Sequence, residues 1–100
     1  MAPDPFAPAP LGPIRLRNRI IKSATFEARA PGGLVSQELI DFHTEVGRGG
    51  VGMTTVAYLA VSPEGRTHAD QVWWRPEALA GLARLTAAVH ETGALVSAQI

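Results

Sequence analysis

Apolar residues occur in three short continuous runs, separated by two longer segments with helical spacing. In LGPIRLRNRIIKSA, residues 11–24, apolar and polar positions first alternate and then run together at Ile20 and Ile21. This change predicts an exposed leading strand followed by a first buried strand over about 19–24. VGMTTVAYLAV, at 51–61, and ALVSAQI, at 94–100, show little alternation and are typical of strands covered on both faces.

Two helices are predicted between these strands. Ser36 is a good N-cap for QELIDFHTEV, residues 37–46, and the glycines of GRGG, residues 47–50, end this helix because a left-handed cap is cheap for glycine. Pro76 at the first helical position begins the second helix, which Gly93 ends.

The resulting order is strand, helix, strand, helix, strand, with crossovers long enough for parallel pairing. This order predicts an α/β fold with a parallel sheet. Two helices and three strands neither cover both faces of such a sheet nor close it into a barrel. We therefore expect the chain to be a piece of a larger fold, with an open sheet edge that favours association, including a homo-oligomer.

Composition narrows the choice of partners and compartment. Prolines at 3, 5, 8, 10 and 13 predict an extended arm and leading strand over 1–18, with no helix and no central strand. The formal net charge is zero, so neither nucleic acid nor a membrane is an expected partner, and Arg15, Arg17, Arg19 and Lys22 are interpreted as one solvated strand face. The chain has no cysteine, no secretory signal and no span-length apolar run, so we expect a soluble, cytoplasmic protein.

Several motifs favour structural interpretations over chemical ones. GRGGVG, at 47–52, follows a helix and precedes a strand, the reverse of the dinucleotide fingerprint. His68 and Asp70 lie in a long loop without a third ligand nearby, which favours a solvated loop over a metal site. No nucleophile, base and orienting group occur together, so a hydrolase triad is unsupported.

The remaining histidines and both tryptophans are also interpreted as structural residues. His43 and His90 fall on the helices and are interpreted as helix-surface or interhelix residues. Trp73 and Trp74 either anchor the long loop or line a substrate channel, and anchoring is the favoured interpretation.

Three segments in this order, LGPIRLRNRIIKSA, GRGGVGMTTVAYLAVSPEGR and LTAAVHETGALVSAQI, resemble the N-terminal part of the old yellow enzyme family of FMN-dependent NADH:flavin oxidoreductases. The resemblance runs from about Phe6 to Ile100. It implies a (β/α)₈ TIM barrel that carries FMN at the carboxyl ends of its strands. Residues 19–100 would then form a partial FMN-binding barrel (βαβαβ) with the first three strands and two helices, incomplete as given.

The same resemblance implies five cofactor-binding residues. Gln99 matches the family glutamine that hydrogen-bonds the flavin pyrimidine edge, and a primary amide offers the donor and the acceptor that such an edge requires. Ala24, Thr25 and Phe26 match the flavin-lining segment after the first strand, and Tyr58 is the best match after the second. The alternative from the residues alone is that Gln99 starts a loop or faces the gap left by truncation, that Thr25 and Phe26 pack at a strand end, and that Tyr58 belongs to the core.

At the position that tunes the flavin in the family, many members carry threonine, cysteine or histidine, whereas this chain has Phe26. A phenyl ring cannot donate a hydrogen bond to the flavin carbonyl. Redox tuning from this position is therefore in doubt, and Thr25 is the candidate to replace it.

The expected function is hydride transfer from NAD(P)H through FMN to an activated alkene, either an enone or an enoyl thioester. No catalytic residue and no metal ligand are identified in the chain, since the family's substrate-activating and proton-donating residues would follow Ile100. The main alternative is a truncated, catalytically inactive partial barrel that acts only by association. A third interpretation is a different α/β barrel that shares the architecture alone.

Overall fold

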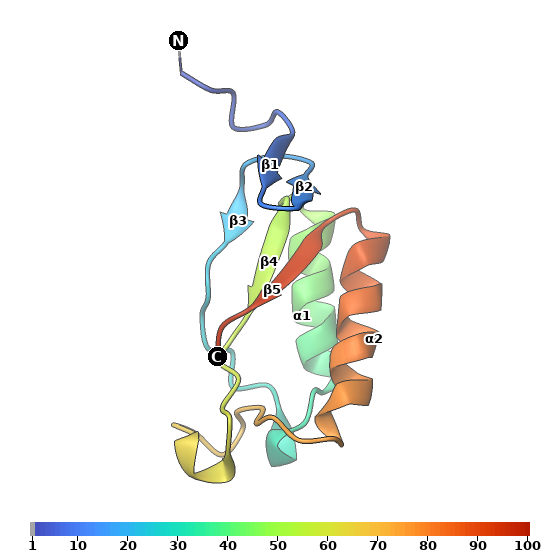
Figure 1. Ribbon diagram of the computed structural model, residues 1–100. Helices are drawn as coiled ribbons and strands as arrows, with labels where there is room; N and C mark the ends of the chain where they lie inside the picture. The colour runs from blue at the N-terminus through green and yellow to red at the C-terminus, as the bar shows by residue number, and fades with distance from the viewer. Residues whose placement is uncertain (1) are drawn as a thin grey trace.

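The computed structural model describes residues 2–100 and contains a three-stranded parallel sheet with two helices packed on one side (Figure 1). The strands stand in the order β3-β4-β5, and Met53 of β4 pairs with Ile21 on one side and Leu95 on the other. The elements of this βαβαβ unit are β3 (Ile21–Lys22), α1 (Gln37–Arg48), β4 (Met53–Val56), α2 (Ala78–Glu91) and β5 (Leu95–Ala98). The predicted α/β order is confirmed.

The three parallel strands are shorter than the apolar runs that predicted them. The sequence predicted strands over about 19–24, 51–61 and 94–100, whereas two to four residues of each run pair in the sheet. The ladder of β4 ends at Val56, and the isolated bridge between Ala60 and Trp73 shows that the chain then also pairs with the following loop. After β4 the apolar run overestimated strand length because Leu59 and Ala60 are buried outside the ladder. Around β3 and after β5 the predicted burial was wrong, since Ile20, Ile21 and Ile100 are exposed.

An antiparallel hairpin replaces the predicted extended arm at the amino end. β1 (Ala9–Leu11) pairs with β2 (Ile14–Leu16) around a turn in which Gly12 has a φ of +56°. Proline is tolerated here because a two-stranded ribbon consists only of edges, and Pro10 lies in β1. The prediction of a single leading strand was wrong on this point, and the first residue of the predicted arm lies outside the described residues.

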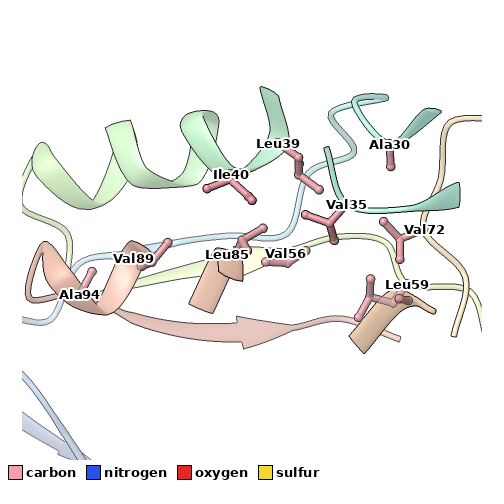
Figure 2. Packing of buried hydrophobic residues seen from close by; sticks show 11 residues of the cluster. Ala30, Val35, Leu39, Ile40, Val56, Leu59, Val72, Leu85, Val89 and Ala94 are labelled. Carbon is pink, nitrogen blue, oxygen red and sulfur yellow. The ribbon is translucent and has the colours of Figure 1, made fainter. Parts of the chain in front are cut away.

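The hydrophobic core lies between the sheet and the two helices (Figure 2). Leu85 and Val89 of α2 are almost completely buried, as is Val56 of β4. Burying an aliphatic side chain stabilises the fold by about 1.5–3 kcal/mol relative to leaving it exposed. The burial of this cluster is therefore the main interaction that holds α1 and α2 on the sheet. The cluster comprises Ala30, Val35, Leu39, Ile40, Val56, Leu59, Val72, Ala78, Leu85, Val89 and Ala94.

The helix ends follow the predicted signals, with one exception. The Ser36 hydroxyl accepts a hydrogen bond from the Leu39 amide at 3.0 Å, as an N-cap should. Gly49 and Gly50 follow α1 and Gly50 has a φ of +108°, so helix termination is confirmed for the glycine motif. α2 begins at Ala78 rather than at Pro76, because Pro76 and Glu77 form a turn before the first helical residue.

The basic residues near the amino end do not form one solvated face, contrary to the sequence interpretation. Arg15 and Arg19 are exposed, but Arg17 is half-buried. The Arg17 guanidinium donates hydrogen bonds to the carbonyls of Gly47 at 2.7 Å, Val51 at 3.1 Å and Thr92 at 2.6 Å. It therefore joins the carboxyl ends of both helices to the start of β4.

Within residues 2–100, neither helix has the length and apolar content that a membrane span requires.

Candidate functional site

The carboxyl ends of the three parallel strands meet at one edge of the sheet, and all five predicted site residues lie on the segments that leave it there. Ala24, Thr25 and Phe26 follow β3, Tyr58 follows β4 and Gln99 follows β5. Backbone hydrogen bonds continue the strand pairing past the ladder, from the Gln99 amide to the Val56 carbonyl at 3.0 Å and from the Leu59 amide to the Gln99 carbonyl at 2.9 Å. Parallel order alone brings these segments together, as the sequence predicted.

Phe26 and Tyr58 form an aromatic stack across this edge. Their ring centroids lie 5.8 Å apart with an interplanar angle of 14°, an offset-stacked arrangement. His68, from the long loop after β4, approaches the Phe26 ring at 5.4 Å with a tilt of 57°. Tyr58 is 39% exposed, so the stack does not cover this residue completely.

A cavity of about 380 Å³ adjoins this stack, within the size range of small-molecule sites. It is lined by Tyr58, Leu59, Ala60, Val61, Gly65, Thr67, Gln71, Gln99 and Ile100. Gln99 is exposed, and within residues 2–100 its side-chain amide makes no hydrogen bond. Its donor and its acceptor are thus both available to a bound molecule.

A second amide borders the same cavity and was missed by sequence reasoning. Gln71 is 3% exposed, and its side-chain oxygen accepts hydrogen bonds from the Thr67 amide at 2.8 Å and the Thr67 hydroxyl at 3.0 Å. These two bonds fold the long loop onto itself. A glutamine in a loop rich in polar residues carries no periodic signal, so nothing in the sequence pattern singles it out.

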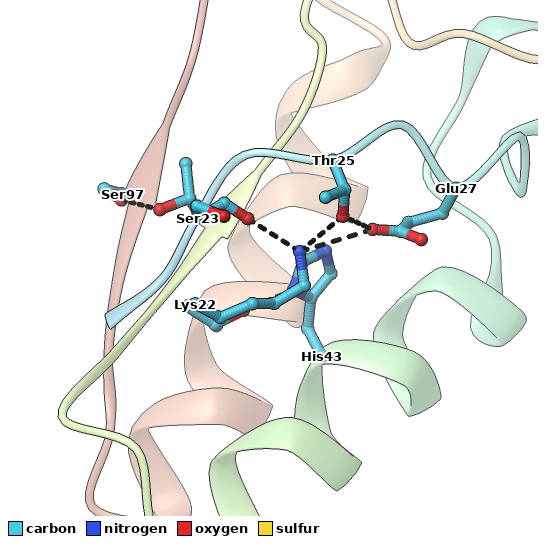
Figure 3. A network of polar contacts seen from close by, with 8 residues as sticks. Lys22, Ser23, Thr25, Glu27, His43 and Ser97 are labelled. Carbon is cyan, nitrogen blue, oxygen red and sulfur yellow. Dashed lines mark hydrogen bonds and ion pairs between the residues drawn. The ribbon is translucent and has the colours of Figure 1, made fainter. Parts of the chain in front are cut away.

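Of the five predicted site residues, Tyr58 and Gln99 line this cavity, whereas Ala24, Thr25 and Phe26 do not. The Thr25 hydroxyl takes part in a separate polar network (Figure 3). The hydroxyl accepts a hydrogen bond from Lys22 Nζ at 2.7 Å and donates one to Glu27 Oε1 at 2.5 Å. Lys22 and Glu27 also form an ion pair at 3.3 Å, with side chains only 17% and 13% exposed. Ala24, between this network and β3, is half-buried.

His43 lies beside this network, completely buried between α1 and the sheet rather than on the helix surface or between the helices. Its Nδ1 is hydrogen-bonded to the Thr54 hydroxyl at 2.7 Å, and its Nε2 has no partner within the described residues. Burial, reinforced by the positive charge of Lys22 and opposed by Glu27, lowers the pKa of His43 to about 4. The imidazole is therefore neutral at physiological pH.

The long loop after β4 carries the other residues singled out from the sequence. His68 is exposed, and its Nδ1 accepts a hydrogen bond from the Asp70 amide at 3.0 Å. Trp73 contacts Gly33, which fits the anchoring interpretation, whereas Trp74 is half-exposed. Within residues 2–100, no three His, Cys, Asp or Glu side chains are grouped so that they could hold a metal ion.

Three comparisons identify proteins similar to this chain. It is 61% identical to 4,4'-dithiodibutanoate disulfide reductase of Rhodococcus erythropolis over 99% of the chain and 25% of the relative. It is 36% identical to NADH oxidase of Thermoanaerobacter brockii over 98% of the chain and 16% of the relative. An old yellow enzyme homologue from Zymomonas mobilis has the same fold over 96% of the chain and 27% of its own length, with a TM-score of 0.83 and 23% identity.

The chain thus spans a quarter or less of the length of these curated relatives. The sequence profile of the NADH:flavin oxidoreductase / NADH oxidase family matches residues 4–100, nearly the whole chain. Both curated relatives carry the names of oxidoreductases. The chain belongs to the NADH:flavin oxidoreductase / NADH oxidase family, the old yellow enzyme type that its sequence motifs predicted.

Proposed function

We propose that this chain forms the first part of an FMN-binding (β/α)₈ barrel in an oxidoreductase that takes hydride from NAD(P)H. The observation that carries the proposal is the convergence of Phe26, Tyr58 and Gln99 at the carboxyl edge of a parallel sheet, beside a cavity of about 380 Å³. Ligands of parallel barrels bind at this edge, where loops from several strands meet. Membership of the flavin oxidoreductase family supports FMN as the ligand.

The residues at this edge suit a flavin. The pyrimidine edge of the flavin presents both donors and acceptors, and the exposed Gln99 amide offers both in return. The apolar and aromatic side chains beside it, Tyr58, Leu59 and Ile100, provide a surface for the flat ring system. Gln99 would bind and orient the pyrimidine edge, and the Phe26–Tyr58 stack would limit where the ring lies.

When bound, FMN supplies the redox chemistry, which is the passage of a hydride from the nicotinamide donor to the acceptor. The residues of this chain contribute binding, orientation and the exclusion of water. Phe26 cannot donate a hydrogen bond, and the Thr25 hydroxyl is engaged by Lys22 and Glu27. We therefore propose that in this protein the segment after β3 acts on the flavin through packing rather than through a hydrogen bond.

The proposed acceptor is an activated alkene, either an enone or an enoyl thioester, in keeping with the resemblance to ene-reductases. The relative with 61% identity favours a second candidate, because its name describes a disulfide reductase. A disulfide takes two electrons and two protons and is cleaved to two thiols, so the same hydride donor serves both reactions. Parallel assays with an enone and with a linear dicarboxylate disulfide distinguish the two acceptors.

Replacing Gln99 tests the proposed site directly. In the full-length protein that contains this chain, Gln99→Ala should raise the dissociation constant of FMN about tenfold, since one or two hydrogen bonds of about 1 kcal/mol each are lost. Fluorescence titration of the flavin-free protein with FMN measures this constant. Gln37→Ala is the matched control, because Gln37 is exposed on α1 and its amide binds Asp41.

Unchanged FMN affinity together with an unchanged flavin absorption spectrum in Gln99→Ala would refute the role of Gln99. Full-length protein that retains no yellow chromophore and binds no added FMN would refute the proposed function as a whole. That second result would instead favour a different α/β barrel.

A further inference from the structure

The segment from Lys22 to Glu27 is wrapped around a single ammonium group (Figure 3). Lys22 Nζ lies 2.9 Å from the Ser23 carbonyl oxygen, 2.7 Å from the Thr25 hydroxyl and 3.3 Å from Glu27 Oε1. The ammonium donates hydrogen bonds to the first two of these oxygens and forms an ion pair with the third. One side chain thus fixes the path of the chain as it leaves β3.

Two of these oxygens, those of Thr25 and Glu27, are also linked to each other. The Thr25 hydroxyl accepts a hydrogen bond from Lys22 and donates its one proton to Glu27. Thr25 therefore bridges the two members of the Lys22–Glu27 ion pair. Hydrogen bonds with charged partners are about twice as strong as neutral ones. Losing the Lys22 ammonium would leave the Thr25 hydroxyl without its donor, and losing the Glu27 charge would weaken the hydrogen bond that Thr25 donates.

This ion pair is the most shielded in the described part of the chain. The side chains of Lys22 and Glu27 are 17% and 13% exposed, whereas Arg29 and Glu38, which also pair, are 40% and 66% exposed. Water and salt screen a shielded pair less, and breaking it leaves a partly buried charge uncompensated. The Lys22 ammonium also lies 5.5 Å from the centre of the Phe42 ring, which holds it against α1.

Phe26 lies between the two tethered residues Thr25 and Glu27. Side chains two residues apart in an extended segment point to the same side, and the residue between them points to the other. Tethering Thr25 and Glu27 toward Lys22 therefore directs Phe26 away from the network, and its ring stacks on Tyr58 at 5.8 Å. Immediately after Glu27 the backbone reverses at Ala28, which has a φ of +53°.

We propose that Lys22 and Glu27 are positioning residues, whose bridged ion pair holds Phe26 stacked on Tyr58 and so shapes the flavin-facing surface at this edge of the sheet. The link to flavin rests on the proposed function. The link to the Phe26–Tyr58 stack does not, and it is tested separately on flavin-free protein.

Chemical nitration of Tyr58 reports on the stack without any flavin. Trypsin cleavage at Arg48 and Arg66 releases residues 49–66, in which Tyr58 is the one tyrosine, so mass spectrometry follows its nitration directly. In Lys22→Met and Glu27→Gln, release of Phe26 should raise the nitration rate of Tyr58 about threefold, as expected for a locally opened segment. Lys22→Arg, which keeps the charge, should restore most of the protection.

The same variants are then loaded with FMN, and flavin binding and the visible circular dichroism of the bound flavin are measured. Lys22→Met and Glu27→Gln should each raise the FMN dissociation constant about three- to tenfold and alter the dichroism, and the double variant should be no worse than either single one because both remove the same interaction. Glu38→Gln is the matched control, since it removes an exposed ion pair with the same change of charge.

Equal nitration rates in wild type, Lys22→Met and Glu27→Gln, in protein with native far-ultraviolet dichroism, would overturn the positioning role. Faster nitration with unchanged FMN affinity and dichroism would overturn the connection to the flavin surface. Failure of the wild type itself to bind FMN would count against the proposed function, and the nitration result would still decide whether the ion pair holds the stack.

Discussion

His43 shows how a single residue can depart from the usual behaviour of its type. It is completely buried, its Nε2 has no partner within residues 2–100, and its pKa is lowered to about 4. An unfolded histidine has a pKa near 6.5, so folding favours the neutral imidazole. The nearest charges partly oppose each other, because Lys22 disfavours the imidazolium and Glu27 favours it.

This difference in pKa predicts that stability depends on pH in the acid range. The stabilisation from neutral His43 is fully present above pH 6.5 and is lost as the pH falls toward 4, because the unfolded chain binds the proton first. The full effect is at most about 3 kcal/mol, from roughly 1.4 kcal/mol for each pKa unit. Urea denaturation between pH 4 and pH 7 measures it as a change in the free energy of unfolding.

Two histidine variants isolate the contribution of this residue. His43→Asn does not titrate and can keep a polar atom close to the Thr54 hydroxyl, so its stability should vary less over this pH range. His90→Gln removes an exposed histidine from α2 and should leave the pH dependence as in the wild type. An identical pH dependence in His43→Asn and wild type would show that other groups cause it.

At the scale of the elements, Arg17 connects parts of the fold that the core alone does not fix. The carboxyl end of a helix leaves carbonyls without partners and carries partial negative charge. The Arg17 guanidinium binds Gly47 at the end of α1 and Thr92 just after α2. It also binds Val51, so the ends of both helices are tied to the start of β4.

Arg17→Met should therefore lower the free energy of unfolding by about 3 kcal/mol, since charged hydrogen bonds are lost and half-buried carbonyls lose their partners. Arg19→Met is the control, because Arg19 is exposed and the change should cost less than about 0.5 kcal/mol. Urea denaturation of the two variants and the wild type at one pH gives both values. Equal losses for the two variants would mean that the network around Arg17 contributes no particular stability.

The helices could be predicted from sequence because their signals are local. Ser36 caps α1 and Gly49 and Gly50 end it, and each of these residues acts within one turn of its own position. Arg17 could not be predicted, because its three partners lie 30 to 75 residues away along the chain. In sequence it is one of several alternating basic residues, and nothing local separates it from the exposed Arg15 and Arg19.

At the scale of the whole molecule, the candidate site was predictable as far as parallel topology determines it. The carboxyl ends of parallel strands lie at one edge of the sheet. The segments that carry Phe26, Tyr58 and Gln99 therefore lie close together at that edge. The polar network behind them was not predictable, because Lys22 was counted with the solvated basic residues and Glu27 belongs to no periodic pattern. Which side a residue of an irregular segment faces depends on tertiary contacts that sequence spacing does not reveal.

The same edge is also held together by two loops from successive strand–helix connections. The Ala30 amide donates to the Asp70 carbonyl at 3.1 Å, and the Arg75 guanidinium, which also covers the Trp73 ring, donates to the Gly32 carbonyl at 2.9 Å. Gly33 lies directly against Trp73, where an added Cβ would come within 2.7 Å of the indole Cδ1. The two loops therefore approach each other as closely as a glycine permits.

Gly32 and Gly33 provide a matched test of that contact. Their φ angles, +70° and +74°, impose nearly the same left-handed strain of about 1–2 kcal/mol on an alanine, but a Cβ at Gly32 would meet nothing within 4 Å. Gly33→Ala should therefore destabilise the protein by about 1–3 kcal/mol more than Gly32→Ala, because Trp73 must move to make room. Urea denaturation measures the difference, and Trp73 is expected to be displaced in Gly33→Ala alone. Equal destabilisation by the two substitutions would mean that Trp73 can move with little loss of stability. The contact between the two loops would then not be what fixes this edge of the sheet.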